Sequence, residues 1–158
     1  MWRFLLLAMI GFGLVWGAPA HAADRVAKAG PTSAGYSFTT ALTYDTIYVY
    51  PSGQTMPRTE AATQFPPQST LTVSVVDAAG KPVAGVPVAF EVAHNSMLHG
   101  MLDITPKQTT TGADGKVQAT IMPSTAATIG TGEVLVRVDN VIEAVRMTLE
   151  KSKVRNTQ

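Results

Sequence analysis

Between residues 70 and 150 apolar side chains recur at every second position in five separate runs, with mostly polar or small residues between them. The five apolar sets are Leu71, Val73 and Val75; Val86, Val88, Phe90 and Val92; Val117, Ala119 and Ile121; Val134, Val136 and Val138; and Val145, Met147 and Leu149. Successive side chains of a strand point to opposite faces, so this period of two predicts strands with one buried face. Two such faces packed together enclose one core, which favours antiparallel sheets.

Four short segments rich in Gly, Asp or Asn lie between the runs, at 77–82, 112–115, 130–132 and 139–140. Glycine and asparagine tolerate a positive φ, and aspartate accepts hydrogen bonds from turn amides, so each segment predicts a turn. Short strands at this spacing predict an all-β fold, an antiparallel β-sandwich of about seven strands.

The N-terminus has the pattern of a secretory signal peptide over residues 1–22. Arg3 is followed by an uncharged stretch at 4–16 and by a small-x-small site ending at Ala22. The apolar stretch is shorter than the ~20 residues of a membrane-spanning helix, and Pro19 interrupts it. We therefore expect a protein in the periplasm or outside the cell, without an integral membrane segment after cleavage.

The rest of the chain divides by composition. Small and polar residues at 23–35 predict a flexible lead-in, and the aromatic, β-branched residues at 36–50 predict strand. Four prolines make 51–69 a long connection or an irregular edge. The sandwich is expected to span 36–150 and to end in a polar tail at 151–158.

Two motifs resemble those of a known bacterial family. The stretch Asp77-Ala-Ala-Gly80-Lys-Pro82-Val-Ala-Gly85, followed by Val86-Pro-Val-Ala-Phe90, is paired with a later Thr111-Gly-Ala-Asp114-Gly115-Lys116. Both resemble the bacterial immunoglobulin-like domain of group 1, the module of intimin- and invasin-type adhesins. The resemblance is strongest over 70–150 and implies an immunoglobulin-like antiparallel β-sandwich.

Composition excludes several kinds of chemistry. The chain has no cysteine, which excludes disulfides, thiolate zinc sites and a cysteine nucleophile. A formal net charge of +1 lacks the basic excess of a nucleic-acid-binding protein. No phosphate-binding loop, dinucleotide fingerprint or nucleophile elbow is present in the sequence. We therefore expect a non-enzymatic protein with no cofactor and no catalytic residue.

All four tyrosines of the chain fall within residues 36–50. If 42–50 is one strand, Tyr44, Tyr48 and Tyr50 share a face of it. Tyrosine combines apolar area with a hydroxyl and is enriched at interfaces, so this face is a candidate partner-binding surface. In the alternative reading, one face of the strand covers the core and the other packs under the proline-rich stretch.

A second candidate is the cluster His94, Met97, His99 and Met101. Imidazole and thioether groups suit copper, and methionine favours Cu(I). In the alternative reading the methionines fill gaps in the core, and the histidines lie at the rim of the sandwich.

The leading hypothesis is a module that contacts an envelope or extracellular protein, or a surface polysaccharide. The second is a small periplasmic copper-binding protein that uses the histidine and methionine cluster. Neither hypothesis involves nucleic acid.

Overall fold

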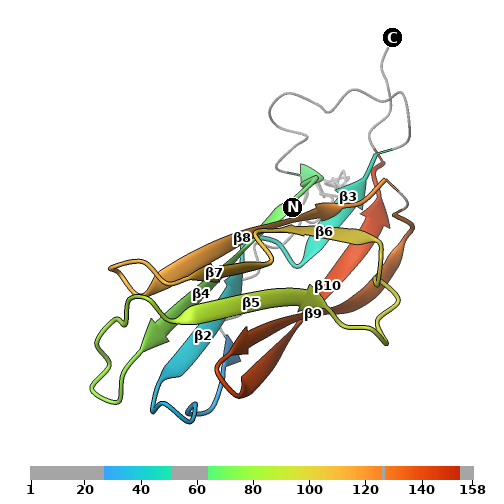
Figure 1. Ribbon diagram of the computed structural model, residues 1–158. Coiled ribbons are helices and arrows are strands. Elements are labelled where there is room, and N and C mark those ends of the chain that lie inside the picture. Colours follow the sequence, from blue (N-terminus) through green and yellow to red (C-terminus); the bar gives the residue numbers. More distant parts are fainter. Residues whose placement is uncertain (1–26, 51–63, 126, 154–158) are drawn as a thin grey trace, which may run out of the picture.

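The computed structural model describes residues 27–50, 64–125 and 127–153, and these residues form ten strands in two sheets (Figure 1). The strands in chain order are β1 (Ala27–Lys28), β2 (Ser37–Leu42), β3 (Thr46–Val49), β4 (Ser69–Val76), β5 (Pro87–Val92), β6 (Leu102–Thr105), β7 (Gln108–Thr110), β8 (Lys116–Pro123), β9 (Gly130–Val138) and β10 (Val141–Lys151). The predicted signal peptide lies outside the described residues.

One sheet has the strand order β1-β2-β4-β8-β6, and the other has the order β3-β10-β9-β5-β7. Every pair is antiparallel except β3 and β10, which run parallel. This arrangement confirms the predicted immunoglobulin-like β-sandwich. The structure has more strands than the seven or so predicted from the sequence. The additional strands β1, β3 and β7 have two, four and three residues, which are too few to show an alternating pattern.

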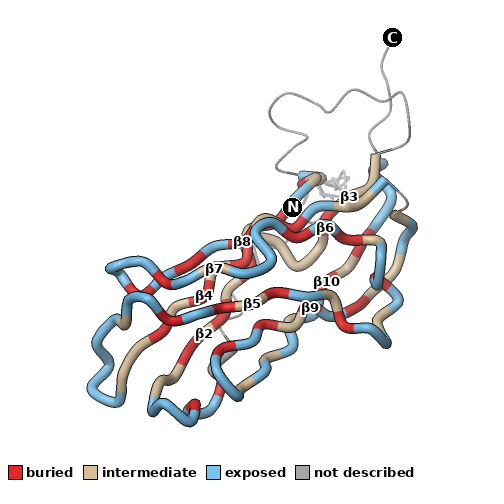
Figure 2. Tube along the Cα trace, viewed as in Figure 1, coloured by how far each residue is buried: buried red, intermediate tan, exposed pale blue. Residues whose placement is uncertain are grey.

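The core lies between the two sheets and is formed by the alternating residues that the sequence singled out (Figure 2). In β4 every second residue is buried, and Leu71, Val73 and Val75 are fully inaccessible to solvent. Val134 and Val136 of β9 meet them from the opposite sheet as members of the same hydrophobic cluster. Each such side chain contributes about 1.5–3 kcal/mol by burial, so period-two patterning is the main source of stability.

The expected single strand over 42–50 is wrong, because the chain changes sheets there. β2 pairs with β4 in one sheet, and β3 pairs with β10 in the other. Ser69 holds the crossover: its Oγ accepts from the Tyr44 N–H at 3.0 Å and donates to the Tyr44 carbonyl oxygen at 2.7 Å. Strand propensity is similar on both sides of this break, so it could not reveal the change of sheet.

The lead-in expected over 23–35 belongs in part to the sandwich. β1 pairs with β2, and Ala29 and Thr32 are buried. Small side chains without a period predicted a flexible segment, but here they allow the backbone to lie close against the domain. The predicted boundary at residue 36 is therefore too late.

The expected boundary at residue 150 is too early. Lys151 is the last residue of β10, and Ser152 is buried. The Ser152 N–H donates to the Val49 carbonyl oxygen at 3.0 Å, which continues the pairing of β10 with β3. The parallel partner strand, which the sequence did not predict, orders these two polar residues.

Three of the four predicted turns are present, and the one at 130–132 is wrong. Asp77 Oδ1 accepts the amides of Ala79 and Lys81, both at 2.9 Å, as expected for a turn aspartate. Gly130 and Gly132 instead lie in β9. A side chain at Gly132 would collide with the loop that follows β5, so close packing explains this glycine.

Asp139, in the β9–β10 turn, has a φ of 54° and ties the N-terminal segment to the domain. The Ser33 hydroxyl and the Ala34 N–H both donate to its Oδ2 atom. The Ser33 hydrogen bond, assisted by backbone amides, outweighs the effect of desolvation and holds the pKa of Asp139 below its usual value.

A lowered pKa makes stability depend on pH on the acid side. In the unfolded chain an aspartate carboxyl titrates near pH 3.9. The contribution of Asp139 to the free energy of unfolding is therefore fully present above that pH, and it is lost as the pH falls through the lower pKa of the folded protein. We expect the free energy of unfolding to fall more steeply between about pH 5 and pH 2 in the wild type than in Asp139→Asn, which tolerates the same φ. Urea unfolding at a series of pH values tests this. Parallel pH profiles for the two proteins would contradict it.

Candidate functional site

The loop at 93–101, between β5 and β6, is fixed to the second sheet by two residues. Leu98 is fully buried in the hydrophobic core. Ser96 Oγ accepts the N–H groups of Leu98 at 3.1 Å and of Glu133 in β9 at 3.2 Å. This anchoring gives the exposed residues around Leu98 defined positions.

The loop brings His94 and His99 together. The distance between His94 Nδ1 and His99 Nε2 is 3.0 Å, and the ring centres are 4.8 Å apart with the planes tilted by 38°. Both side chains are exposed. Two imidazoles are thus paired in a position that solvent can reach.

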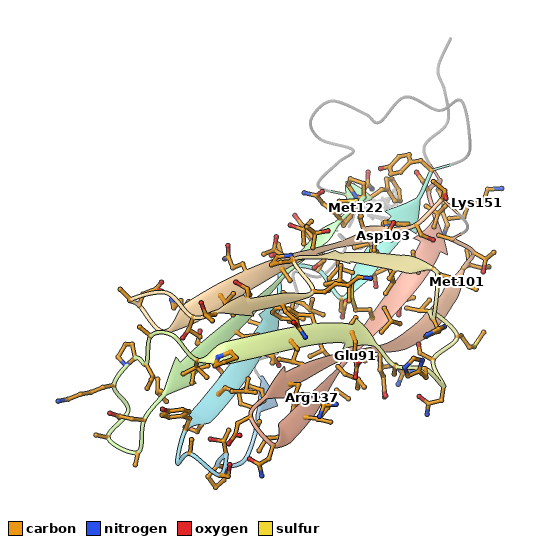
Figure 3. The ribbon with its side chains drawn as sticks, in the orientation of Figure 1. Glu91, Met101, Asp103, Met122, Arg137 and Lys151 are labelled. Atoms are coloured by element: carbon orange, nitrogen blue, oxygen red, sulfur yellow. The ribbon has the colours of Figure 1, made fainter. Side chains whose placement is uncertain are left out.

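The two histidines line a recess of about 350 Å³ between β5 and β6. Glu91, Asp103 and Lys107 are the charged residues of its wall. Figure 3 shows Glu91 on β5 and Asp103 on β6, with Arg137 beside Glu91. The distance between Arg137 Nη2 and Glu91 Oε1 is 3.8 Å, and both side chains are about half exposed.

The four-residue cluster predicted from sequence is not assembled around one point. Met101 Sδ accepts a hydrogen bond from the Thr128 hydroxyl at 3.1 Å, and Met97 packs beside Gly130. Neither methionine lines the recess that holds the histidines. Within 27–50, 64–125 and 127–153, no group of three or more His, Asp and Glu side chains could hold a metal ion. The structure therefore joins the two histidines but not the methionines.

The three candidate tyrosines do not share one face. Tyr44 lies in the crossover between sheets and packs against the core. Tyr48 of β3 meets Phe65 edge to face, with ring centres 5.1 Å apart, and the Tyr50 hydroxyl donates to the Phe65 carbonyl oxygen at 2.6 Å. Burial, with the nearby charges of Glu150 and Asp45, raises the pKa of Tyr48. Tyr48 and Tyr50 thus both contact Phe65, close to the point where the chain returns into β4.

An apolar surface that the sequence did not predict lies at the end of the sandwich. Met97 and Ile129 are 69% and 64% exposed, and Met97 packs against Gly130, the residue that follows Ile129. Two large apolar side chains with this exposure at one end of a sandwich mark a candidate contact surface. Ile129 follows a run of small residues in the β8–β9 connection, which is the only signal in the sequence for its exposure.

Two recesses extend this apolar surface over the outward face of β9 and β10. One, of about 480 Å³, includes Ile129, Thr148 and Glu150, and the other, of about 500 Å³, includes Met97; Thr131 lines both. We call these five residues the Met97–Ile129 surface. The edge strand β3 lies beside β10 (Figure 1), and Glu150 of β10 is paired with Tyr48 of β3. The Met97–Ile129 surface therefore reaches the edge strand.

Across the described residues, we find no helix with the length and apolar character needed to cross a membrane.

The chain has distant similarity to several solved structures. It is 11% identical to the E. coli chaperone DraB, with a TM-score of 0.47, covering 75% of this chain and 58% of that one. For the periplasmic chaperone SfaE the values are 12%, 0.43, 75% and 59%. For the cupredoxin domain of amoB from Nitrosocaldus yellowstonii they are 11%, 0.41, 82% and 99%. The chain thus spans less than two thirds of the two chaperones.

A search of curated proteins finds no match to the chain. The family model of the bacterial Ig-like domain (group 1) matches residues 66–150, which include all of β4 to β9 and all but the last residue of β10. This match covers more than half of the chain and agrees with the observed two-sheet sandwich. The chain therefore belongs to the bacterial Ig-like domain (group 1) family.

Proposed function

We propose that this chain is a non-enzymatic module of the bacterial cell envelope, exported to the periplasm or beyond, that contacts another protein through the Met97–Ile129 surface. The main observation in support is the position of Met97 and Ile129, which lie at the same end of the sandwich. They are the two most exposed of the large apolar residues in the described chain. Contacts of this kind gain free energy when apolar side chains at the centre of an interface lose water.

The surroundings of this surface support a protein partner. Glu133 and Arg146, opposite each other on β9 and β10, line the recess that holds Met97, and Lys151 and Lys153 line the one that holds Ile129. Apolar centres bordered by charges of both signs are typical of transient protein interfaces. The anchor at Leu98 and Ser96 also keeps Met97 in a defined position, which lowers the entropic cost of binding.

The tyrosines contribute less than the sequence hypothesis assumed. Tyr44 packs on the core, and the Tyr50 hydroxyl already has a partner in Phe65. Tyr48 remains at the margin of the proposed contact, beside Glu150. A surface polysaccharide as partner would rest on such an aromatic platform, and the edge-to-face packing of Phe65 on Tyr48 leaves less of that ring for stacking.

Site-specific photocrosslinking in the native bacterium tests the proposal. A benzophenone side chain replaces Ile129 in one protein and Gln118 in another. Gln118 is an exposed residue on the outward face of β8, in the opposite sheet, and serves as the matched control. We expect one dominant protein adduct from position 129, identified by mass spectrometry, and none from position 118.

A second variant measures the energetic role of the apolar pair. Ile129→Asp places a charge at the centre of the proposed contact, and we expect it to lower partner capture about tenfold or more while leaving the free energy of unfolding within about 0.5 kcal/mol. Equal adducts from positions 129 and 118 contradict the proposal. Retention on purified surface polysaccharide without a protein adduct supports the alternative partner.

A further inference from the structure

We propose that His94 and His99 form a binding site for one divalent late transition-metal ion, with Cu(II) bound more tightly than Zn(II). The site differs from the copper site expected from sequence, because it uses the two imidazoles without the methionines. It lies in the recess between β5 and β6 and is separate from the Met97–Ile129 surface. Metal binding therefore does not depend on the proposed protein contact.

The separation of the two nitrogens fits chelation. Metal–imidazole bonds are about 2.0 Å long, so two cis ligands place their nitrogens about 2.8 Å apart at 90° and about 3.3 Å apart at the tetrahedral angle. The observed 3.0 Å corresponds to an angle of about 97° at the metal. That value is compatible with two cis ligands of one ion, and the general affinity order of divalent first-row metals for nitrogen ligands places Cu(II) above Zn(II).

Ring orientation provides an independent measurement. A straight N–H···N bond of the same length would hold the ring centres about 5.3 Å apart, whereas they are 4.8 Å apart. The axes of the two rings are therefore inclined to the line that joins the nitrogens. In the metal-free protein the two rings are joined by a bent N–H···N hydrogen bond, and this inclination is compatible with both nitrogen lone pairs turning towards one ion.

The remainder of the recess limits the affinity. Glu91 and Asp103 line it but do not form a group of three ligands with the histidines, so water fills the other positions on the ion. Lys107 in the same wall and Arg137 beside Glu91 balance the two carboxylates, and the recess has no excess of negative charge. With only two protein ligands, we expect a dissociation constant on the order of 1–10 μM for Cu(II).

The test uses the exported protein after removal of bound metal with a chelator. Calorimetry with Cu(II) and with Zn(II) gives stoichiometry and affinity, and electron paramagnetic resonance of the Cu(II) form counts coordinated nitrogens. We expect one Cu(II) per chain, a spectrum with two imidazole nitrogens, and Zn(II) binding about tenfold weaker.

Variants identify the ligands. His94→Ala and His99→Ala are each expected to weaken Cu(II) binding about tenfold or more. Met97→Leu keeps the size of an exposed residue in the same loop and is expected to bind as the wild type does. Circular dichroism checks that each variant is folded.

Three results overturn the proposal. The first is a wild-type protein that shows no saturable Cu(II) binding below about 100 μM. The second is unchanged affinity in the double variant His94→Ala/His99→Ala. The third is a wild-type spectrum with fewer than two imidazole nitrogens, which needs no variant at all.

Discussion

Gly115→Ala is expected to destabilise the protein by about 3–5 kcal/mol, on the order of 10–20 °C in Tm. Gly115 has a φ of +69°, and a Cβ atom there would lie 2.6 Å from the Val75 carbonyl oxygen and 2.9 Å from Pro82 Cβ. Two costs therefore add: the left-handed backbone and a collision with atoms that cannot rotate away. Val75 belongs to β4 and its N–H donates to the Gly115 carbonyl oxygen at 2.8 Å, so moving the turn also breaks a backbone hydrogen bond.

Gly80→Ala is the matched control for this prediction. Gly80 has a φ of +79°, but a Cβ atom there meets nothing within 4 Å. Only the backbone cost applies, about 1–2 kcal/mol. Thermal and urea unfolding of both variants separate the two terms. Equal losses in Gly115→Ala and Gly80→Ala would show that the collision is relieved by a small backbone movement.

Gly132→Ala is expected to cost about 2–4 kcal/mol and to loosen the 93–101 loop. An added Cβ atom would lie 1.9 Å from Ser96 Oγ and 2.8 Å from Leu98 Cγ. If the Ser96 side chain rotates away, its hydroxyl oxygen loses the hydrogen bonds that it accepts from the N–H groups of Leu98 and Glu133. Leu98 is fully buried in the hydrophobic core, so moving its side chain aside disturbs that packing.

Gly130→Ala, two residues earlier in β9, is the control. The nearest atoms to an added Cβ there are at 3.6–3.8 Å, which is ordinary contact, so we expect a change within about 0.5 kcal/mol. Amide hydrogen exchange gives a local readout: the N–H groups of Leu98 and Glu133 should exchange faster in Gly132→Ala than in Gly130→Ala. Unchanged protection of both amides would mean that the loop keeps its place on β9.

The core could be read from the sequence because its signal is local and repeated. Leu71, Val73 and Val75 alternate with polar residues, and a residue's face follows from its parity along the strand. The change of sheet at Tyr44 and the ordering of Ser152 could not be predicted in this way. Both depend on partners distant in sequence, Ser69 for the first and Val49 for the second.

The candidate site was predicted in part for the same reason. His94 and His99 are five residues apart, and a tight loop brings them together, as a local pattern can indicate. The spacing of the residues could not show that Met97 and Met101 contact residues 128–130. That segment is distant in sequence and lies beside the 93–101 loop only in the packed fold. Ile129 was missed because its significance comes from Met97, which is thirty-two residues earlier in the sequence and packs beside the adjacent Gly130.

The position of β10 has a consequence for the order in which the fold can form. β10 is the last of the described strands, yet it lies inside its sheet, between β3 and β9. Until it has been synthesised, β3 has no partner strand and the edge of β9 stays open. Such late, long-range pairing slows folding, because the entropy of closing a long loop is lost before any contact compensates for it. A chain that leaves the ribosome N-terminus first thus stays incompletely folded until β10 has emerged, the condition in which a polypeptide can still be threaded through a narrow channel.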